Sequence, residues 1–153
     1  GKTYLEELLQ HMQKTTGKLA SIVGRYFAMD RDKRWERVKL AYDLLVHGKG
    51  EHTTQPIQAL EASYQNNVTD EFVKPIVVCD ASNQPLATIQ PDDIVICFNF
   101  RTDRGRQITQ ALTQEDFPEQ GMKKLPLYYV TLTNYDDTFR GVKVMFDKDN
   151  LNN

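Results

Sequence analysis

The sequence lacks the motifs of the common catalytic and metal sites. It has no Gly-rich phosphate loop, no GxSxG, no HExxH and no CxxC, and no nucleophile stands beside a plausible base. The three histidines, His11, His47 and His52, are scattered. His47 and His52 flank a glycine loop at a spacing that could chelate a metal, but no carboxylate pair is placed to complete the site. We therefore expect this chain to bind a ligand but not to transform it on its own.

Long apolar runs and cysteines are also scarce. No apolar run approaches the roughly 20 residues that span a bilayer. The amphipathic first residues, GKTYLEELLQ, do not resemble a signal peptide, which begins with a basic stretch followed by an apolar one. The two cysteines, Cys79 and Cys97, lie far apart inside apolar, strand-like runs, which predicts buried, reduced thiols. These features predict a cytoplasmic protein.

A general excess of basic residues is missing too. The 153 residues carry a formal net charge of −2, and the sequence pI is near 5.9. Non-specific nucleic-acid binding usually needs a basic face, so this balance argues against it. The length and the 40% hydrophobic content predict one soluble domain over residues 1–153. Because the chain starts without a methionine and inside a helical pattern, we expect it to be part of a longer protein.

Arginine, by contrast, is concentrated in two places. Seven of the eight arginines fall in two short stretches, GRYFAMDRDKRWER at 24–37 and CFNFRTDRGR at 97–106. We call these the first and second arginine windows. The guanidinium is a planar fork of N–H donors that matches carboxylate and phosphate oxygens and stays charged at neutral pH. Because each window follows an apolar run, the pattern predicts two walls of one anion site.

Apolar periodicity predicts helices alternating with strands. The segment HGKGEHTT is expected to be a loop. The expected helices cover 3–13, 35–45, 56–66 and about three turns around 108–112, and the expected strands cover 18–23, 76–79, 86–89, 94–98, 125–132 and 142–146. This order indicates an α/β protein, a three-layer α/β/α domain with a mixed, partly parallel sheet. Both arginine windows then lie at strand-to-helix junctions, where anions collect.

The arginines of the two windows are not equivalent. The sequence predicts that the anion is bound by the residues nearest the junctions, namely Arg25, Arg31, Arg101 and Arg104.

The remaining charged residues of the windows have simpler interpretations. Arg34 and Arg37 lie three apart on an expected helix among acidic residues, which is typical of surface ion pairs. Asp30 and Asp103 are expected to orient arginines or cap helices rather than act as catalytic acids.

Aromatic residues are interleaved with these basic residues, an arrangement that could imitate a base-stacking surface. They lie in or next to apolar runs, which favours packing in the core. The residues concerned are Tyr26, Phe27, Trp35, Phe98 and Phe100.

Four strings resemble the cofactor-independent (2,3-bisphosphoglycerate-independent) phosphoglycerate mutases: GRYFAMDRDKRWERVKLAYD, DEFVKP, DDIVICFNFRTDRGRQI and YDDTFRGVKVMFDKDNLNN. The resemblance covers essentially the whole chain. It implies most of a substrate-binding domain inserted into a phosphatase-like domain, with residues 147–153 as the hinge between them. It also implies substrate contacts at Arg25, Arg31, Arg101 and Arg104, of which we expect Arg101 to take the carboxylate.

The resemblance further implies an isomerase of glycolysis that interconverts 3-phosphoglycerate and 2-phosphoglycerate. The serine nucleophile and two manganese ions would belong to the phosphatase-like domain, and this chain alone would be inactive. Two alternatives remain open: a stand-alone binding module for small phosphorylated or carboxylated metabolites, and a nucleic-acid or protein interaction domain that uses the same arginines.

Overall fold

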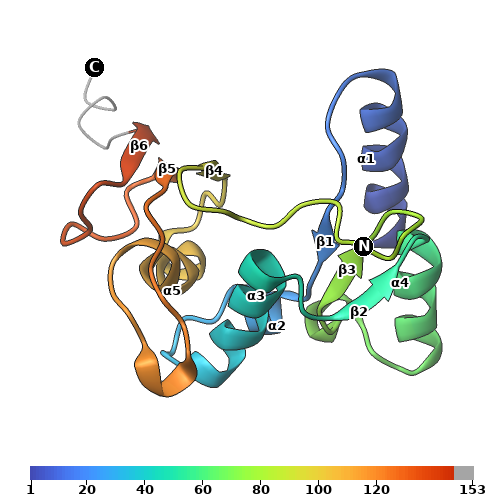
Figure 1. The fold of residues 1–153 in the computed structure, drawn as a ribbon, viewed down its shortest axis with the longest axis horizontal. Coiled ribbons are helices and arrows are strands. Elements are labelled where there is room, and N and C mark those ends of the chain that lie inside the picture. Colours follow the sequence, from blue (N-terminus) through green and yellow to red (C-terminus); the bar gives the residue numbers. More distant parts are fainter. Residues whose placement is uncertain (147–153) are drawn as a thin grey trace.

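The computed structural model of the chain describes residues 1–146 and contains helices and strands in alternation (Figure 1). The α-helices are α1 (Lys2–Lys14), α2 (Arg25–Ala28), α3 (Trp35–His47), α4 (Pro56–Gln65) and α5 (Thr102–Thr113). The strands are β1 (Ser21–Ile22), β2 (Glu51–Thr53), β3 (Ile76–Val78), β4 (Ile94–Cys97), β5 (Tyr128–Thr133) and β6 (Lys143–Phe146). Two short 3₁₀ turns, η1 (Asp70–Phe72) and η2 (Pro118–Gln120), complete the set.

The first sheet has the strand order β1–β3–β2 and is covered by helices on both faces. Its central strand β3 runs antiparallel to β1 and parallel to β2, and all its residues are buried. Successive residues of a strand point to opposite faces. Ile76 accordingly packs with Ala59 and Leu60 of α4, and Val77 packs with Leu44 of α3. This part of the molecule has the predicted three layers.

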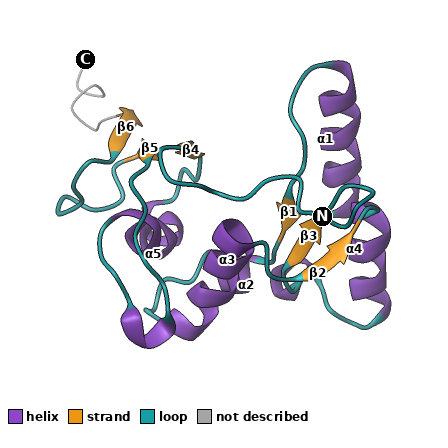
Figure 2. Cartoon of the chain, viewed as in Figure 1, coloured by secondary structure: helices purple, strands orange, loops and turns teal. Residues whose placement is uncertain are grey.

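The second sheet has the order β4–β5–β6 and is parallel throughout. Figure 2 shows its strands well apart from those of the first sheet. Helix α5 covers one face: Ile108 and Leu112 share a core cluster with Tyr129 of β5. The Thr109 hydroxyl donates to the Tyr129 hydroxyl over 3.1 Å in the same interior. Amphipathic α5 therefore has its apolar stripe on this sheet.

Helix α3 joins the two halves. Val38, Ala41 and Tyr42 pack in the core cluster that also contains residues of α5 and β5, while Leu44 faces β3. Figure 1 shows α3 between the two sheets. The predicted mixed α/β class is confirmed, and its strands are divided between one mixed and one parallel sheet.

Two local predictions were wrong. Residues 86–89 form no strand; the pairing ends at one bridge between Cys79 and Pro85, after which the Ile89 amide donates to the Leu45 carbonyl at the end of α3. The segment HGKGEHTT is not all loop, since Glu51–Thr53 forms β2. That strand is short, polar and at a sheet edge, so it has no apolar alternation to reveal it.

Three further predictions concern single regions. Cys79 and Cys97 are free thiols, the first buried and the second half-buried. The proposed hinge at 147–153 lies outside the described residues. Within 1–146, no helix combines the length and the apolar character that crossing a bilayer requires.

Candidate anion-binding site

A glycine begins the first arginine window because backbone approaches it closely. A Cβ on Gly24 would lie 2.3 Å from the Glu71 carbonyl oxygen, and the Gly24 amide donates to the Val73 carbonyl over 2.8 Å. This contact brings α2 against η1. As a result, Arg25 Nη2 lies 2.7 Å from the Glu71 carboxylate.

Asp30 organises the turn between α2 and α3. Its buried carboxylate accepts the amides of Asp32 and Arg34, each over 3.0 Å, and Nη1 of Arg34 over 3.1 Å. Burial alone would raise the pKa of Asp30. The hydrogen bonds from the Arg34 and Asp32 amides and from the Arg34 guanidinium outweigh it and lower that pKa below its usual value. The turn therefore depends on an ionised Asp30.

The expected ion pairs of Arg34 and Arg37 are present. Arg34 contacts Asp30 and Asp32, and Arg37 Nη1 lies 3.9 Å from Asp30. The Arg37 guanidinium also lies 3.9 Å from the centre of the Tyr26 ring, a cation–π distance. These contacts involve a buried carboxylate, so they are more than surface pairs.

Arg104 links the second window to the first. It lies in the first turn of α5, and its Nη1 donates to the Met29 carbonyl over 2.9 Å. Within residues 1–146, no carboxylate lies within 4.0 Å of its guanidinium in an ion pair. A neutral carbonyl thus fixes Arg104, and among residues 1–146 its charge has no direct counter-ion.

Asp103 makes a second link. Its carboxylate lies 2.8 Å from Arg101 Nη2 and 3.3 Å from Arg31 Nη1, so it bridges the two windows. The hydrogen bond from Arg101, followed by that from Arg31, lowers the pKa of Asp103. Asp103 orients both arginines, as the sequence predicted.

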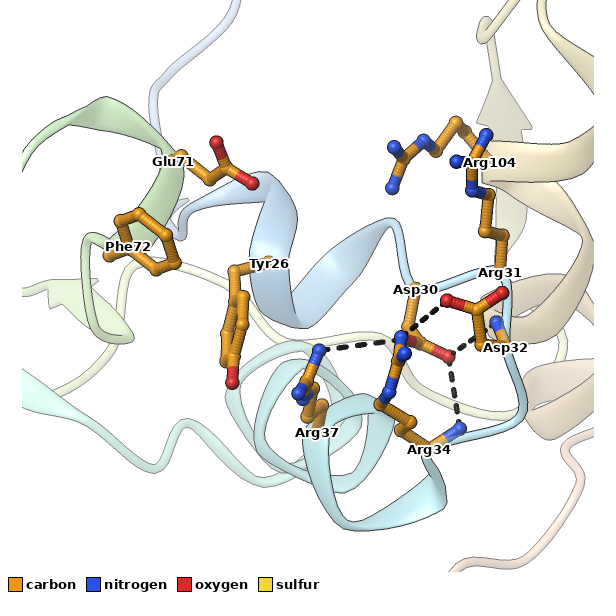
Figure 3. Close-up of a pocket in the computed structure, with 9 residues that line it drawn as sticks. All are labelled: Tyr26, Asp30, Arg31, Asp32, Arg34, Arg37, Glu71, Phe72 and Arg104. Carbon is orange, nitrogen blue, oxygen red and sulfur yellow. Dashed lines mark hydrogen bonds and ion pairs between the residues drawn. The ribbon is translucent and has the colours of Figure 1, made fainter.

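These contacts surround a pocket of about 220 Å³ (Figure 3). Two of the four predicted arginines, Arg31 and Arg104, line it together. Arg25 and Arg101 are not in its lining. Arg25 lies beside Glu71 at a neighbouring hollow, and Arg101 is connected through Asp103. The other residues that line the pocket are Tyr26, Asp30, Asp32, Arg34, Arg37, Glu71 and Phe72.

The sequence missed Glu71 and Phe72, which come to the pocket from η1. Both residues lie in the string DEFVKP, which carries part of the family resemblance, but no spacing relates this string to the first window, and it is the close approach at Gly24 that places it there. The aromatic predictions succeed in part. Phe27 and Trp35 pack against the core, but Phe98 and Phe100 are 77% and 75% exposed, so their predicted core packing was wrong. Ile94, Ile96 and Tyr128, on the same side of the second sheet as Phe98, are exposed as well.

No metal centre accompanies the pocket in the described part of the chain. No group of three or more His, Cys, Asp or Glu residues in 1–146 is arranged to hold a metal ion. His52 Nε2 instead lies 3.2 Å from the Gly48 carbonyl. The arrangement can hold an anion between fixed guanidinium groups, with ionised carboxylates keeping those groups in place.

Comparisons with known proteins agree on one family. The family model described as BPG-independent PGAM N-terminus (iPGM_N) matches residues 1–137. A 2,3-bisphosphoglycerate-independent phosphoglycerate mutase of Flavobacterium psychrophilum is 61% identical over 147 residues, which are 96% of this chain and 29% of that protein. One of Parabacteroides distasonis is 54% identical over 154 residues, or 100% of this chain and 30% of that protein.

A solved structure supports the same relationship. The fold is similar to that of Leishmania mexicana phosphoglycerate mutase, solved at low cobalt concentration, with a TM-score of 0.76 and 30% sequence identity over 89% of this chain and 26% of that one. The chain thus spans about 30% of the length of the curated relatives it matches. By its sequence and its fold, the chain belongs to the family of 2,3-bisphosphoglycerate-independent phosphoglycerate mutases.

Proposed function

We propose that these residues are the substrate-gripping part of a phosphoglycerate mutase that interconverts 3-phosphoglycerate and 2-phosphoglycerate. The serine that carries the phosphoryl group, and the two manganese ions, would lie on a phosphatase-like domain outside these residues. The chain would then be inactive alone, and its partners would be the substrate and that domain. A glycolytic role would place the protein in the cytoplasm.

One observation supports this proposal most strongly: Arg31 and Arg104, from opposite arginine windows, line one pocket. The substrate carries a carboxylate and a phosphoryl group, and both have oxygens spaced for a guanidinium fork. Arg34 is engaged by two carboxylates, whereas Arg104 is fixed by a carbonyl and keeps its charge available. We therefore assign the strongest anion contact to Arg104.

Arg25 and Arg101 would complete the grip at a later stage. Each is engaged by one carboxylate, Arg25 by Glu71 and Arg101 by Asp103, and each side chain is more than half exposed. Exposed ion pairs of this kind are weak, so a substrate anion can compete for either guanidinium. The carboxylate contact that we expect of Arg101 would form in this way.

The chemical work of these residues would be to hold and orient the substrate. Fixed forks position the phosphoryl group for transfer, retain the glycerate while it re-orients, and stabilise the charge that develops. In this proposal the phosphatase-like domain would supply the metal chemistry, and these residues would hold and orient the substrate.

The proposal is tested by titrating 3-phosphoglycerate into isotope-labelled protein and following the backbone amides and the arginine side-chain N–H signals by NMR. We expect saturable shifts at Arg25, Arg31, Arg101, Arg104 and their neighbours. Arg104→Ala should abolish them, and Arg104→Lys should weaken them because the fork is lost while the charge remains. The matched control is Arg140→Ala, at an exposed arginine outside both windows.

Two results would contradict this assignment. Shifts scattered over the surface, or equally reduced by Arg140→Ala, would mean that the arginines only attract anions in general. Mutase turnover by the purified chain would mean that the nucleophile lies within these residues. A well-folded spectrum without shifts would mean that the grip forms only when the other domain is present.

A further inference from the structure

The second sheet leaves much of one face exposed. Along β4 and β5, the side chains that point away from α5 include Ile94, Ile96 and Tyr128, which are 72%, 54% and 55% exposed. Met145 of β6 is on the same side by register. Phe98 continues the alternation beyond the end of β4. We call these five residues the outer face.

A bare apolar face is unusual on a sheet of this type. Parallel sheets occur almost only with both faces covered, because their crossover helices pack on both sides. The first sheet follows this rule, with α4 on one face of β3 and α3 on the other. The second sheet has α5 on its inner face, and within residues 1–146 its outer face has no such cover.

The edge strand β4 of the same sheet also indicates a missing cover. Among the described residues, β4 pairs only with β5 and is therefore an edge strand. An edge presents unpaired N–H and C=O groups, and natural proteins protect long apolar edges with charge, proline or a covering element. Residues 94–97, Ile-Val-Ile-Cys, carry neither charge nor proline. This strand suits an interior position.

We propose that the outer face is a docking surface for a further segment of the same polypeptide, beyond these 153 residues, which lays an apolar helix or strand face over Ile94, Ile96 and Tyr128. The curated relatives supply the source of such a segment, since this chain spans only 29–30% of their length. The outer face is uncharged across β4 and β5, and by register Lys143 lies on the same side only at β6, opposite Val130. The apolar area over β4 and β5 fits an apolar partner.

The outer face lies close in sequence to the candidate anion site. Phe98 and the equally exposed Phe100 lead directly into Arg101 at the start of α5. A segment that covers the outer face would therefore lie next to Arg101. Docking would order the loop between β4 and α5 and limit the access of water to this side of the arginines. Docking on the outer face needs no substrate and does not depend on the proposed reaction.

The test compares two methionines in two settings. Met145 is 51% exposed on the outer face, whereas Met122 is fully buried in the core, so Met122 is an internal control. The two settings are this chain alone and a full-length hybrid in which it replaces the matching 147 residues of the Flavobacterium psychrophilum relative. Oxidation by dilute peroxide is followed by mass spectrometry.

We expect Met145 to oxidise quickly in the chain alone and at least about tenfold more slowly in the hybrid, with Met122 slow in the hybrid. We also expect Ile96→Asp to be tolerated by the chain alone and to lower the melting temperature of the hybrid. If the chain alone cannot fold without its cover, Met122 will oxidise quickly in the chain alone. The oxidation rate of Met145 in the hybrid then tests the proposal.

Other outcomes would overturn the proposal. Rapid oxidation of Met145 in the hybrid, or a hybrid that tolerates Ile96→Asp, would show that nothing docks on this face. Protection of Met145 that appears in the chain alone, and is lost on dilution together with a dimer, would assign the face to a second copy. A hybrid that protects Met145 but does not bind the anion would count against the proposed function and would leave the docking surface in place.

Discussion

The two sheets have the same number of strands but differ in how deeply those strands are buried. Each has three strands, yet every residue of the central strand β3 is buried in the first sheet, whereas in the central strand β5 of the second only Tyr129 and Thr131 are buried, between exposed and half-buried residues. The difference comes from the helices: α4 and α3 sandwich β3, while α5 packs on one face only of the second sheet. Strand pairing alone therefore does not make a stable layer; the covering elements decide how much apolar surface leaves water.

The candidate anion site lies where these unequal halves meet. Arg31 follows β1 of the first sheet and α2, Arg104 follows β4 of the second sheet, and the contacts Arg104–Met29 and Arg31–Asp103 join the two halves. We call these two contacts the seam. A ligand that binds both arginines would strengthen the seam, so the site is sensitive to the stability of either half.

The comparison predicts its largest effect in the first sheet. Ile76→Ala removes a side chain that is 1% exposed and packs against α4, so the free energy of unfolding should fall by about 2–5 kcal/mol. The same change at Ile96, which is 54% exposed, should cost less than about 1 kcal/mol in this chain. Urea denaturation of both variants measures the difference. Equal losses at the two positions would show that the outer face is already packed.

The next effect is expected at Asp30, which holds the turn on the first-sheet side of the seam. Asp30→Asn removes the charge that accepts the Arg34 and Asp32 amides and should cost about 1–3 kcal/mol near neutral pH. The folded pKa of Asp30 is lowered, so the unfolded chain binds its proton first as the pH falls. Its contribution is therefore complete above about pH 4–5 and is lost below that range.

This linkage gives Asp30→Asn a distinct signature. The stability gap between the wild-type chain and the variant should be wide at pH 7 and should narrow as the pH falls through the carboxyl range. Thermal melts at a series of pH values measure it. A gap that stays constant with pH would mean that the variant acts through packing and not through the charge of Asp30.

The elements that the sequence predicted well have strong, local periodicity. Helix α3 is marked by Trp35, Val38, Tyr42 and Leu45 at helical spacing, and β4 is marked by an unbroken apolar run. What failed was decided by distant contacts. The edge strand β2 is polar and forms only because β3 lies beside it, and residues 86–89 are apolar but bond to the end of α3 instead of a strand. Periodicity contains no information about such partners.

The candidate site divides in the same way. The sequence singled out Arg31 and Arg104 because the windows adjoin predicted strand ends, and the two do line one pocket. It could not reveal that Glu71 engages Arg25, since that pair depends on the close backbone approach at Gly24. Nor could the sequence show that Phe98 and Phe100 are exposed, because an apolar run has the same pattern whether or not another element packs over it.

A smaller effect is expected at Tyr135, which follows β5 of the second sheet. Its buried hydroxyl donates to the Asn99 carbonyl over 2.6 Å and so fixes the loop that follows β4. Tyr135→Phe should cost about 0.5–1.5 kcal/mol and raise hydrogen exchange in residues 98–101. The matched control is Tyr128→Phe, which removes a hydroxyl from the exposed outer face and should change neither quantity. A silent Tyr135→Phe would mean that other contacts hold this loop.

The smallest effect on stability, and the sharpest test of the seam, is expected at Asp103. Its ion pairs with Arg31 and Arg101 are exposed, and exposed pairs contribute little to folding, so Asp103→Asn should leave the denaturation midpoint nearly unchanged. The same change removes the counter-charge of two guanidinium groups. Affinity for inorganic phosphate should therefore rise, by no more than about fivefold, and the gain should shrink as salt is added. Calorimetric titration at two salt concentrations measures it. Weaker binding by Asp103→Asn would mean that Asp103 is needed to position the arginines more than it competes for them, and that the seam is built for orientation first.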